Sequence, residues 1–144
     1  MKWHKSTLEI STGGKGLFPI TSEIQNLLRA WGVREGMCYL YLPHASASLV
    51  ISESYDPSAK EDIEEYFERL VPEDQSWMTH TLEGGDDSSS HIRTALTQVD
   101  LAIPIEDGQL ALGTWQGVFV FEHRRGRQVR RVLLRCIEMS GESP

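Results

Sequence analysis

The strongest constraint on the fold of this chain is a change in hydrophobic periodicity near residue 100. Before this point, segments with the helical period alternate with segments that have the two-residue period of strands. After it, four β segments follow one another, at residues 101–105, 109–112, 114–122 and 129–137. Helices and strands followed by a run of strands favour an α+β fold over a doubly wound parallel sheet.

The length of the chain sets the number of domains. Its 144 residues are the usual size of one domain, so we expect a single domain over residues 1–144. Residues 138–144 are mostly polar and are expected to form a C-terminal tail.

Three helices are expected before residue 100. The apolar face of the first consists of Ile24, Leu27, Leu28 and Trp31. Thr21 or Ser22 is expected to cap its start, and Gly32 follows its end, where glycine is favoured. Strands are expected on either side of it at residues 3–10 and 37–43, with residues 48–52 beside the latter.

The other two helices precede the run of strands. Asp56 and Pro57 are typical of a helix start, the first as cap and the second in the first turn. The buried stripe of this second helix is expected to consist of Ala59, Ile63, Phe67 and Leu70. The third helix is expected over residues 88–96, with Ile92, Ala95 and Leu96 facing inward.

Composition excludes several classes of partner. Lys and Arg total 14 and Asp and Glu total 21, so the formal net charge is −7. This charge argues against binding to nucleic acid or to anionic membranes, both of which require a cationic surface. The apolar runs are too short to span a membrane, and two cysteines without zinc-site spacing indicate a reduced, cytoplasmic protein.

Three histidines lie at element boundaries, where side chains from different elements meet. His44 follows a predicted strand, His80 lies between two helices, and His91 lies in the first turn of the third helix. Three imidazoles with an open fourth position are a known arrangement for catalytic zinc. The alternative is three surface or hydrogen-bonded histidines without a metal.

The residues after His44 suggest a second chemistry. Ser46 and Ser48 follow it closely and could pair a nucleophile with a base, although no G-x-S-x-G elbow is present. Such serines commonly form turns instead.

The strand at residues 114–122 carries further polar candidates. Gln116 and Glu122 lie on one face but six residues apart, roughly 20 Å at the rise of a strand, too far to share one small ligand unless another strand or subunit brackets it. Trp115 points to the other face and is interpreted as core packing. Arg130 is a candidate to receive a phosphate.

Nine motifs recur in an order that resembles the YjbQ family, also named the secondary thiamine-phosphate synthase family. They are residues 43–49, Glu53, residues 56–57, residues 70–72, His80, residues 83–87, residues 90–92, residues 112–117 and residues 122–124. The resemblance implies a mixed β-sheet curled into a partly open barrel with about three helices, and a homotrimer with a polar pocket near the subunit boundary. Ala45, Ser52 and Ser54 depart from the family pattern close to His44 and Glu53, which puts identical substrate recognition in question.

The functional hypothesis combines this resemblance with the residues. The proposed ligands of a divalent metal, zinc or magnesium, are His44, His80 and His91. The proposed catalytic residues are Glu53, Asp86, Gln116 and Glu122. The proposed substrate-binding residues are Ser46, Ser48, Trp115 and Arg130.

The expected activity is a weak, secondary thiamine-phosphate synthase reaction on phosphate or pyrophosphate compounds, in which the protein stabilises the leaving group. Two alternatives stay open. One is a trimer that binds a small phosphorylated or anionic metabolite without catalysis, and the other is a Ser/His hydrolase.

Overall fold

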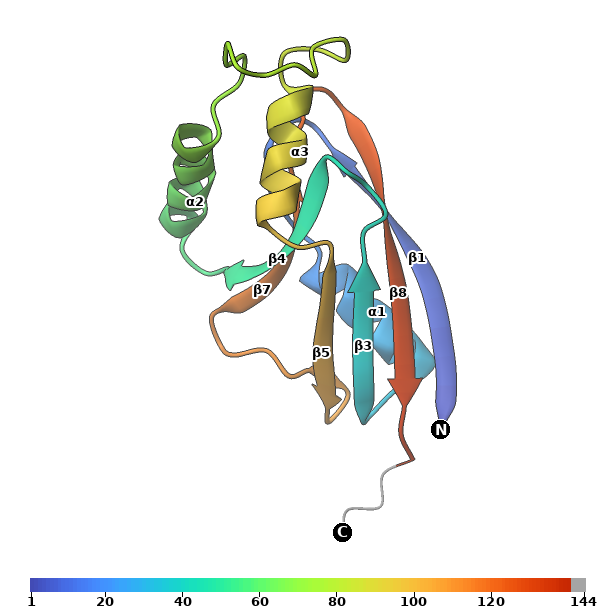
Figure 1. Cartoon of the computed structure of the whole chain (residues 1–144). Coiled ribbons are helices and arrows are strands. Elements are labelled where there is room, and N and C mark those ends of the chain that lie inside the picture. Colours follow the sequence, from blue (N-terminus) through green and yellow to red (C-terminus); the bar gives the residue numbers. More distant parts are fainter. Residues whose placement is uncertain (141–144) are drawn as a thin grey trace.

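The computed structural model describes residues 1–140, which form three helices and eight strands (Figure 1). The helices are α1 (Thr21–Trp31), α2 (Pro57–Leu70) and α3 (Asp87–Leu96). The strands are β1 (Lys2–Thr12), β2 (Gly16–Pro19), β3 (Gly36–Tyr41), β4 (Ala47–Glu53), β5 (Asp100–Glu106), β6 (Gln109–Leu110), β7 (Gln116–Glu122) and β8 (Gln128–Glu138). None of the helices in the described part is both long and apolar enough to cross a membrane.

The strands form two sheets around one core. The larger sheet has the order β1-β8-β3-β5-β6 and the smaller has the order β2-β7-β4, with antiparallel pairing between neighbours. Alternate residues of β3, such as Cys38 and Leu40, pack with Leu49 and Val120 of the smaller sheet. The α+β fold, the three helices and the partly open barrel are confirmed.

Helix α1 packs on the inner face of the larger sheet. Ile24 and Leu28 are completely buried in the shared core, and Gly32 ends the helix in the left-handed conformation with φ of 68°. The predicted side-chain cap is wrong, because Ile20 holds the N-cap position. The hydroxyl of Thr21 instead accepts a hydrogen bond from the Val118 N–H at 2.9 Å, which ties the helix start to β7.

Helix α2 lies on the outside of the molecule, and its predicted buried stripe is only partly realised. Asp56 caps it as expected, accepting a hydrogen bond from the Ser58 N–H at 2.9 Å. Ile63 and Phe67 pack on a small second cluster with Phe121, but Leu70 is exposed. Helix α2 packs on β2 and, through Ile63 and Phe67, on Phe121 of β7, and this apolar contact does not extend to Leu70.

Helix α3 reverses the predicted orientation. Ala95 and Leu96 are exposed, whereas Ser89, Ser90 and Arg93 are buried. The polar face turns inward because Arg93 reaches Glu68 of α2 at 3.2 Å and the Val71 carbonyl at 2.8 Å. Polar groups are stable in such buried positions when they have hydrogen-bonded partners.

Two further expectations need correction. Residues 48–52 do not pair with the strand at residues 37–43, because β4 belongs to the smaller sheet and pairs with β7. Glu138 ends β8 and contacts His4 at 2.8 Å, so the proposed tail does not begin at residue 138. The last four residues of that tail, 141–144, lie outside the described residues.

The outer face of the larger sheet is open. Its register places Trp3, Ile137, Met37 and Pro104 in one row across β1, β8, β3 and β5. Tyr39 and Tyr41 of β3 are exposed on the same face. The register also places Lys5, Arg135 and Asp100 beside these tyrosines, so the exposed face mixes aromatic and charged side chains.

Candidate functional site

The N-terminal turn of α3 brings three potential metal ligands together. Asp87 begins the helix and His91 follows four residues later, so both side chains lie on one face. His80 reaches the same point from the loop between α2 and α3. Oδ2 of Asp87 lies 2.6 Å from Nε2 of His80 and 2.9 Å from Nε2 of His91.

This cluster has the dimensions of a metal site. One ligand atom from each of His80, Asp87 and His91 lies within 4.8 Å of the other two. The imidazoles are 49% and 40% exposed, whereas the carboxylate is buried. A cavity of about 340 Å³ adjoins His80 and is lined also by Asp74 and by the hydroxyl residues Ser76, Thr81 and Ser88. An ion in this position would keep open coordination positions, as catalytic sites do.

Both ring nitrogens of His91 face oxygen acceptors. Its Nδ1 lies 2.7 Å from the Ala45 carbonyl oxygen, and its Nε2 faces the Asp87 carboxylate. Both neighbours are acceptors, but a neutral imidazole has only one N–H. Two arrangements satisfy both contacts. In one, His91 carries a proton on each ring nitrogen, and in the other a metal ion lies between Nε2 and Asp87.

Arg124 fixes the carboxylate of the cluster, Asp87, and the neighbouring carboxylate of Asp86. Its Nη1 donates to Oδ1 of Asp87 at 2.5 Å and its Nε donates to Oδ2 of Asp86 at 3.0 Å. Burial favours the protonated form of Asp87, but the hydrogen bond from His80, the charge of His91 and then that of Arg124 outweigh it and hold the pKa of Asp87 below its ordinary value. The carboxylate therefore stays ionised.

Asp86 is held in the same way and does not act as a free base. Burial favours its protonated form too, but hydrogen bonds from the Arg125 N–H and from Arg124 keep the pKa of Asp86 below its ordinary value. Both of its oxygens lie against Arg124. We define the His end of the molecule by His80, Asp86, Asp87, His91 and Arg124.

Sequence reasoning missed Asp87 as a ligand and Arg124 as its partner. The Asp87–His91 spacing of four residues on a helix was a usable signal. Arg124 stands in the family motif at residues 122–124, but its partner could not be read from the sequence, because only the tertiary fold brings the β7–β8 turn to the start of α3.

His44 does not join the cluster. Its Nε2 accepts a hydrogen bond from the Arg131 N–H at 3.0 Å, and it is absent from the group of ligand atoms within 4.8 Å in the described part of the chain. Burial lowers the pKa of His44, and the charges of Arg130 and Arg131 lower it further, so this imidazole stays neutral. Its neighbour Ala45 provides the link to the His end, through the carbonyl that contacts His91.

Glu122 and Arg130 form a buried ion pair rather than a solvent-facing site. Glu122 is completely buried and Arg130 is 4% exposed. The Glu122 carboxylate accepts hydrogen bonds from Thr12 and Arg130 and from the backbone N–H groups of His123 and Arg124. The pair thus positions the backbone that carries Arg124, and its groups are engaged with the protein rather than with a substrate.

The two candidate serines are also engaged inside the protein. Ser46 accepts a hydrogen bond from Arg130 at 2.9 Å. Ser48 lies 2.9 Å from Nε2 of His123, and both are completely buried. Neither forms a hydrogen bond with His44 within residues 1–140, so the geometry gives no support to a Ser46- or Ser48-based hydrolase.

The remaining candidates lie at the opposite end of the smaller sheet. Glu53 pairs with Gln116, whereas Ala47 at the other end of β4 pairs with Glu122. Six residues of strand separate the two ends by roughly 20 Å. Trp115 is 56% exposed, so its interpretation as core packing is wrong. We define the Trp end by Glu53, Ser54, Tyr55, Trp115 and Gln116.

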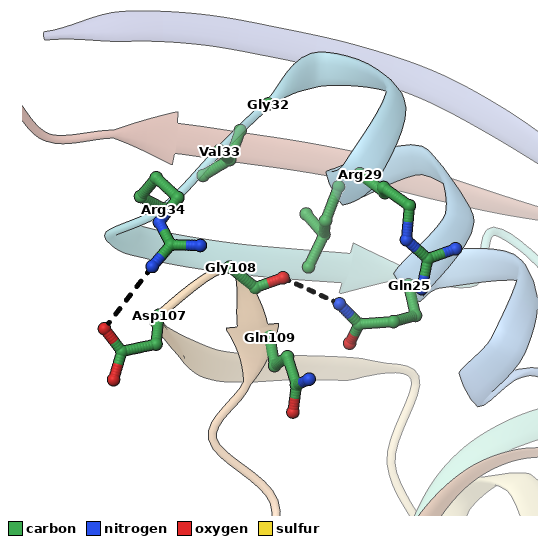
Figure 2. A pocket seen from close by; sticks show the side chains of 9 residues that line it. Gln25, Arg29, Gly32, Val33, Arg34, Asp107, Gly108 and Gln109 are labelled. Carbon is green, nitrogen blue, oxygen red and sulfur yellow. Dashed lines mark hydrogen bonds and ion pairs between the residues drawn. The ribbon is translucent and has the colours of Figure 1, made fainter.

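A separate cavity of about 330 Å³ lies at the C-terminal end of α1 (Figure 2). The Gln25 amide donates to the Gly108 carbonyl at 2.8 Å, and Arg34 lies 3.7 Å from Asp107. These contacts hold the β5–β6 hairpin against α1. Among the described residues, Asp107 is the only acidic one that lines this cavity, so the cavity lacks the donors of a metal site.

Comparison with known proteins places the chain in a family. Residues 6–139 match the model of the family described as UPF0047 protein YjbQ-like. The chain is 45% identical to the UPF0047 protein sll1880 of Synechocystis sp., over 96% of this chain and 92% of the relative. It is 37% identical to the UPF0047 protein YjbQ of Escherichia coli O157:H7, over 91% and 95% respectively.

A solved structure agrees with this assignment. The conserved hypothetical protein TT1486 from Thermus thermophilus superposes with a TM-score of 0.83 at 33% identity, covering 92% of this chain and 99% of that one. Sequence and fold therefore lead to the same conclusion, that this chain belongs to the UPF0047 (YjbQ-like) family.

Proposed function

We propose that this chain is a divalent-metal-dependent enzyme acting on phosphate esters or pyrophosphates, with His80, Asp87 and His91 as the metal ligands. The observation that carries the proposal is the environment of His91, both of whose ring nitrogens face oxygen acceptors. A metal ion between Nε2 and Asp87 satisfies all three side chains with His91 in its neutral form, the form in which imidazole binds metals.

The donor set favours zinc over magnesium. Two imidazole nitrogens and one carboxylate oxygen suit zinc or another first-row transition ion, whereas magnesium prefers oxygen ligands. The hydrogen bond from His91 to the Ala45 carbonyl and the contact of Arg124 with Asp87 are the outer contacts that orient metal ligands.

The chain's own residues would bind and orient a substrate around this centre. A divalent ion bound there supplies Lewis acidity for phosphate oxygens. The hydroxyl groups of Ser76, Thr81 and Ser88 line the adjoining cavity and offer hydrogen bonds to a substrate placed in it. Arg124 keeps Asp87 ionised and in position. Within this class, the joining of the thiamine pyrimidine and thiazole phosphate halves is the first reaction to test.

We propose further that the chain forms a homotrimer through the open face of the larger sheet. The exposed Trp3, Tyr39 and Tyr41 on this face support it, since burial of such a surface stabilises association. Light scattering is expected to give a mass near three chains, and a monomer mass at micromolar protein would contradict this.

The free, buried thiols of Cys38 and Cys136 fit a reducing compartment such as the cytoplasm.

Metal titration tests the central proposal. Protein prepared without a polyhistidine tag is titrated with zinc and with magnesium in a calorimeter. We expect tight zinc binding, weakened at least about a hundredfold in His80→Ala and Asp87→Asn, because loss of one ligand leaves an incomplete chelate. The matched control His44→Ala is expected to change zinc affinity by less than about threefold, since this side chain lies outside the cluster.

Turnover is then measured on the zinc-loaded protein with aryl phosphates, inorganic pyrophosphate and the two thiamine precursors. Loss of both zinc binding and turnover in the same variants supports the enzyme. Zinc binding without turnover would leave a binding module for a small anionic metabolite. Zinc affinity unchanged in both His80→Ala and Asp87→Asn would overturn the proposed centre.

A further inference from the structure

Two aromatic rings at the Trp end are exposed rather than packed in the core. Tyr55 is 75% and Trp115 is 56% exposed, and their ring centroids lie 5.0 Å apart in an edge-to-face arrangement at 68°. Exposed aromatic surface carries a cost in water unless a ligand or partner covers it.

The loops that carry these rings are fixed by hydrogen bonds. The Trp115 carbonyl accepts from the Ser54 N–H at 2.8 Å, and the Gln116 side chain accepts from the Gly113 N–H at 2.8 Å. The Glu53 carboxylate accepts from the N–H groups of Tyr55 and Asp56, at 3.2 Å and 3.0 Å. The rings are therefore presented in a preorganised position, which lowers the entropic cost of binding.

Close approach of the two loops adds to this rigidity. A Cβ at Gly117 would lie 2.7 Å from the Ser54 Cβ. Only glycine therefore lets these two backbone segments approach each other so closely. The Trp115 loop is locked against the end of β4.

A cavity of about 280 Å³ opens beside Tyr55, and its lining combines apolar surface with negative charge. Phe119 and Pro57 line it together with Glu53 and Asp56, and Lys60 is the single basic residue among the described residues that line it. Hydrogen bonds from the backbone and the hydroxyl of Ser58 hold the pKa of Asp56 below its ordinary value, so this carboxylate is ionised at neutral pH.

We propose that the Trp end binds a small organic cation, a ligand with a quaternary or protonated nitrogen. Electron-rich ring faces attract such cations, and carboxylates beside the rings add complementary charge. An anion would meet Glu53 and Asp56 instead. The proposed metal centre lies at the other end of β4 and β7, so this site is separate and does not depend on the proposed function.

Choline is a suitable probe, with its neutral isostere 3,3-dimethylbutan-1-ol as the matched ligand control. We expect saturable choline binding by calorimetry, a shift of the Trp115 indole N–H resonance, and at least about fivefold weaker binding of the neutral isostere. Trp115→Ala and Glu53→Gln are each expected to weaken choline binding by about five- to tenfold.

Trp77→Ala is the matched protein control, since Trp77 is exposed like Trp115 but lies in the α2–α3 loop, outside the Trp end. It is expected to leave choline affinity unchanged, as is His80→Ala at the metal centre. Unchanged zinc affinity and circular dichroism in Trp115→Ala would verify that this variant is folded.

Equal affinity for choline and its neutral isostere would overturn the proposal, as would choline binding that persists in both Trp115→Ala and Glu53→Gln. A Trp115 resonance that responds to protein dilution but not to choline would also overturn it, by showing that a second copy of the chain covers the rings.

Discussion

The two ends of the smaller sheet differ in where they place charge and aromatic surface. At the His end the Asp87 carboxylate is buried and paired with Arg124, and the adjoining Glu122 is buried and paired with Arg130. At the Trp end, the Glu53 carboxylate accepts hydrogen bonds from backbone N–H groups, and the rings of Tyr55 and Trp115 face solvent. The same pair of strands, β4 and β7, thus connects a network of ion pairs with an open aromatic surface.

This difference has a physical cause. Charges survive burial only when each has hydrogen-bonding partners, and the His end provides them from β1, β7, β8 and the α2–α3 loop. The Trp end lies where β4 ends and β7 begins, and no further element of residues 1–140 covers its rings. Stability should therefore depend strongly on side chains of the His end and weakly on those of the Trp end.

The largest effect is expected when the buried ion pair is broken. Glu122→Gln leaves the Arg130 guanidinium buried without its counter-charge and should reduce the free energy of unfolding by about 3–5 kcal/mol. The matched control Glu53→Gln at the Trp end should cost less than about 1 kcal/mol, because that carboxylate is partly exposed. Urea unfolding followed by circular dichroism compares the two, and equal costs would contradict the contrast between the ends.

An effect of intermediate size is expected on the pH dependence of the unfolding free energy, and it should come from His123, which follows Glu122. Burial, together with the charges of Arg93 and Arg130, lowers the pKa of His123 from 6.5 to about 3. Between these values the unfolded chain binds a proton that the folded chain does not, so stability falls as the pH decreases through this window. The fall should be about 2 kcal/mol between pH 6.5 and pH 5.

The matched variant for this prediction is His123→Gln, which has no group that titrates in this window. Its unfolding free energy should depend on pH less steeply than that of the parent between pH 6.5 and pH 5. An identical slope in His123→Gln and the parent would show that His123 is not the group responsible.

The smallest effect is expected at Trp115. Trp115→Ala removes a half-exposed ring while the backbone hydrogen bond to Ser54 remains, so the loss of stability should be below about 1 kcal/mol. Phe121→Ala, nearer the His end and in edge-to-face contact with Phe67 at a ring-centroid distance of 5.0 Å, should cost about 3–5 kcal/mol by the same urea measurement. A cost at Trp115 as large as that at Phe121 would mean that the Trp end is part of the core.

Local sequence patterns were sufficient to predict those structural features that depend on residues close together along the chain. Periodicity identified the three helices and most strands, and the Asp56–Pro57 start and the Gly32 end were found because caps depend on a few adjacent residues. The family resemblance rested on motifs that can be read along the chain, and it is confirmed over residues 6–139.

Only the tertiary structure decided which candidates meet. His80 and His91 come together because the α2–α3 loop folds back on the start of α3, and Asp87 rather than His44 lies between them. The inward face of α3 is polar because Arg93 finds partners on α2, which no periodicity can reveal. Contacts between segments distant along the chain depend on packing and burial, so the sequence determined the elements, and the fold determined which side chains share a site.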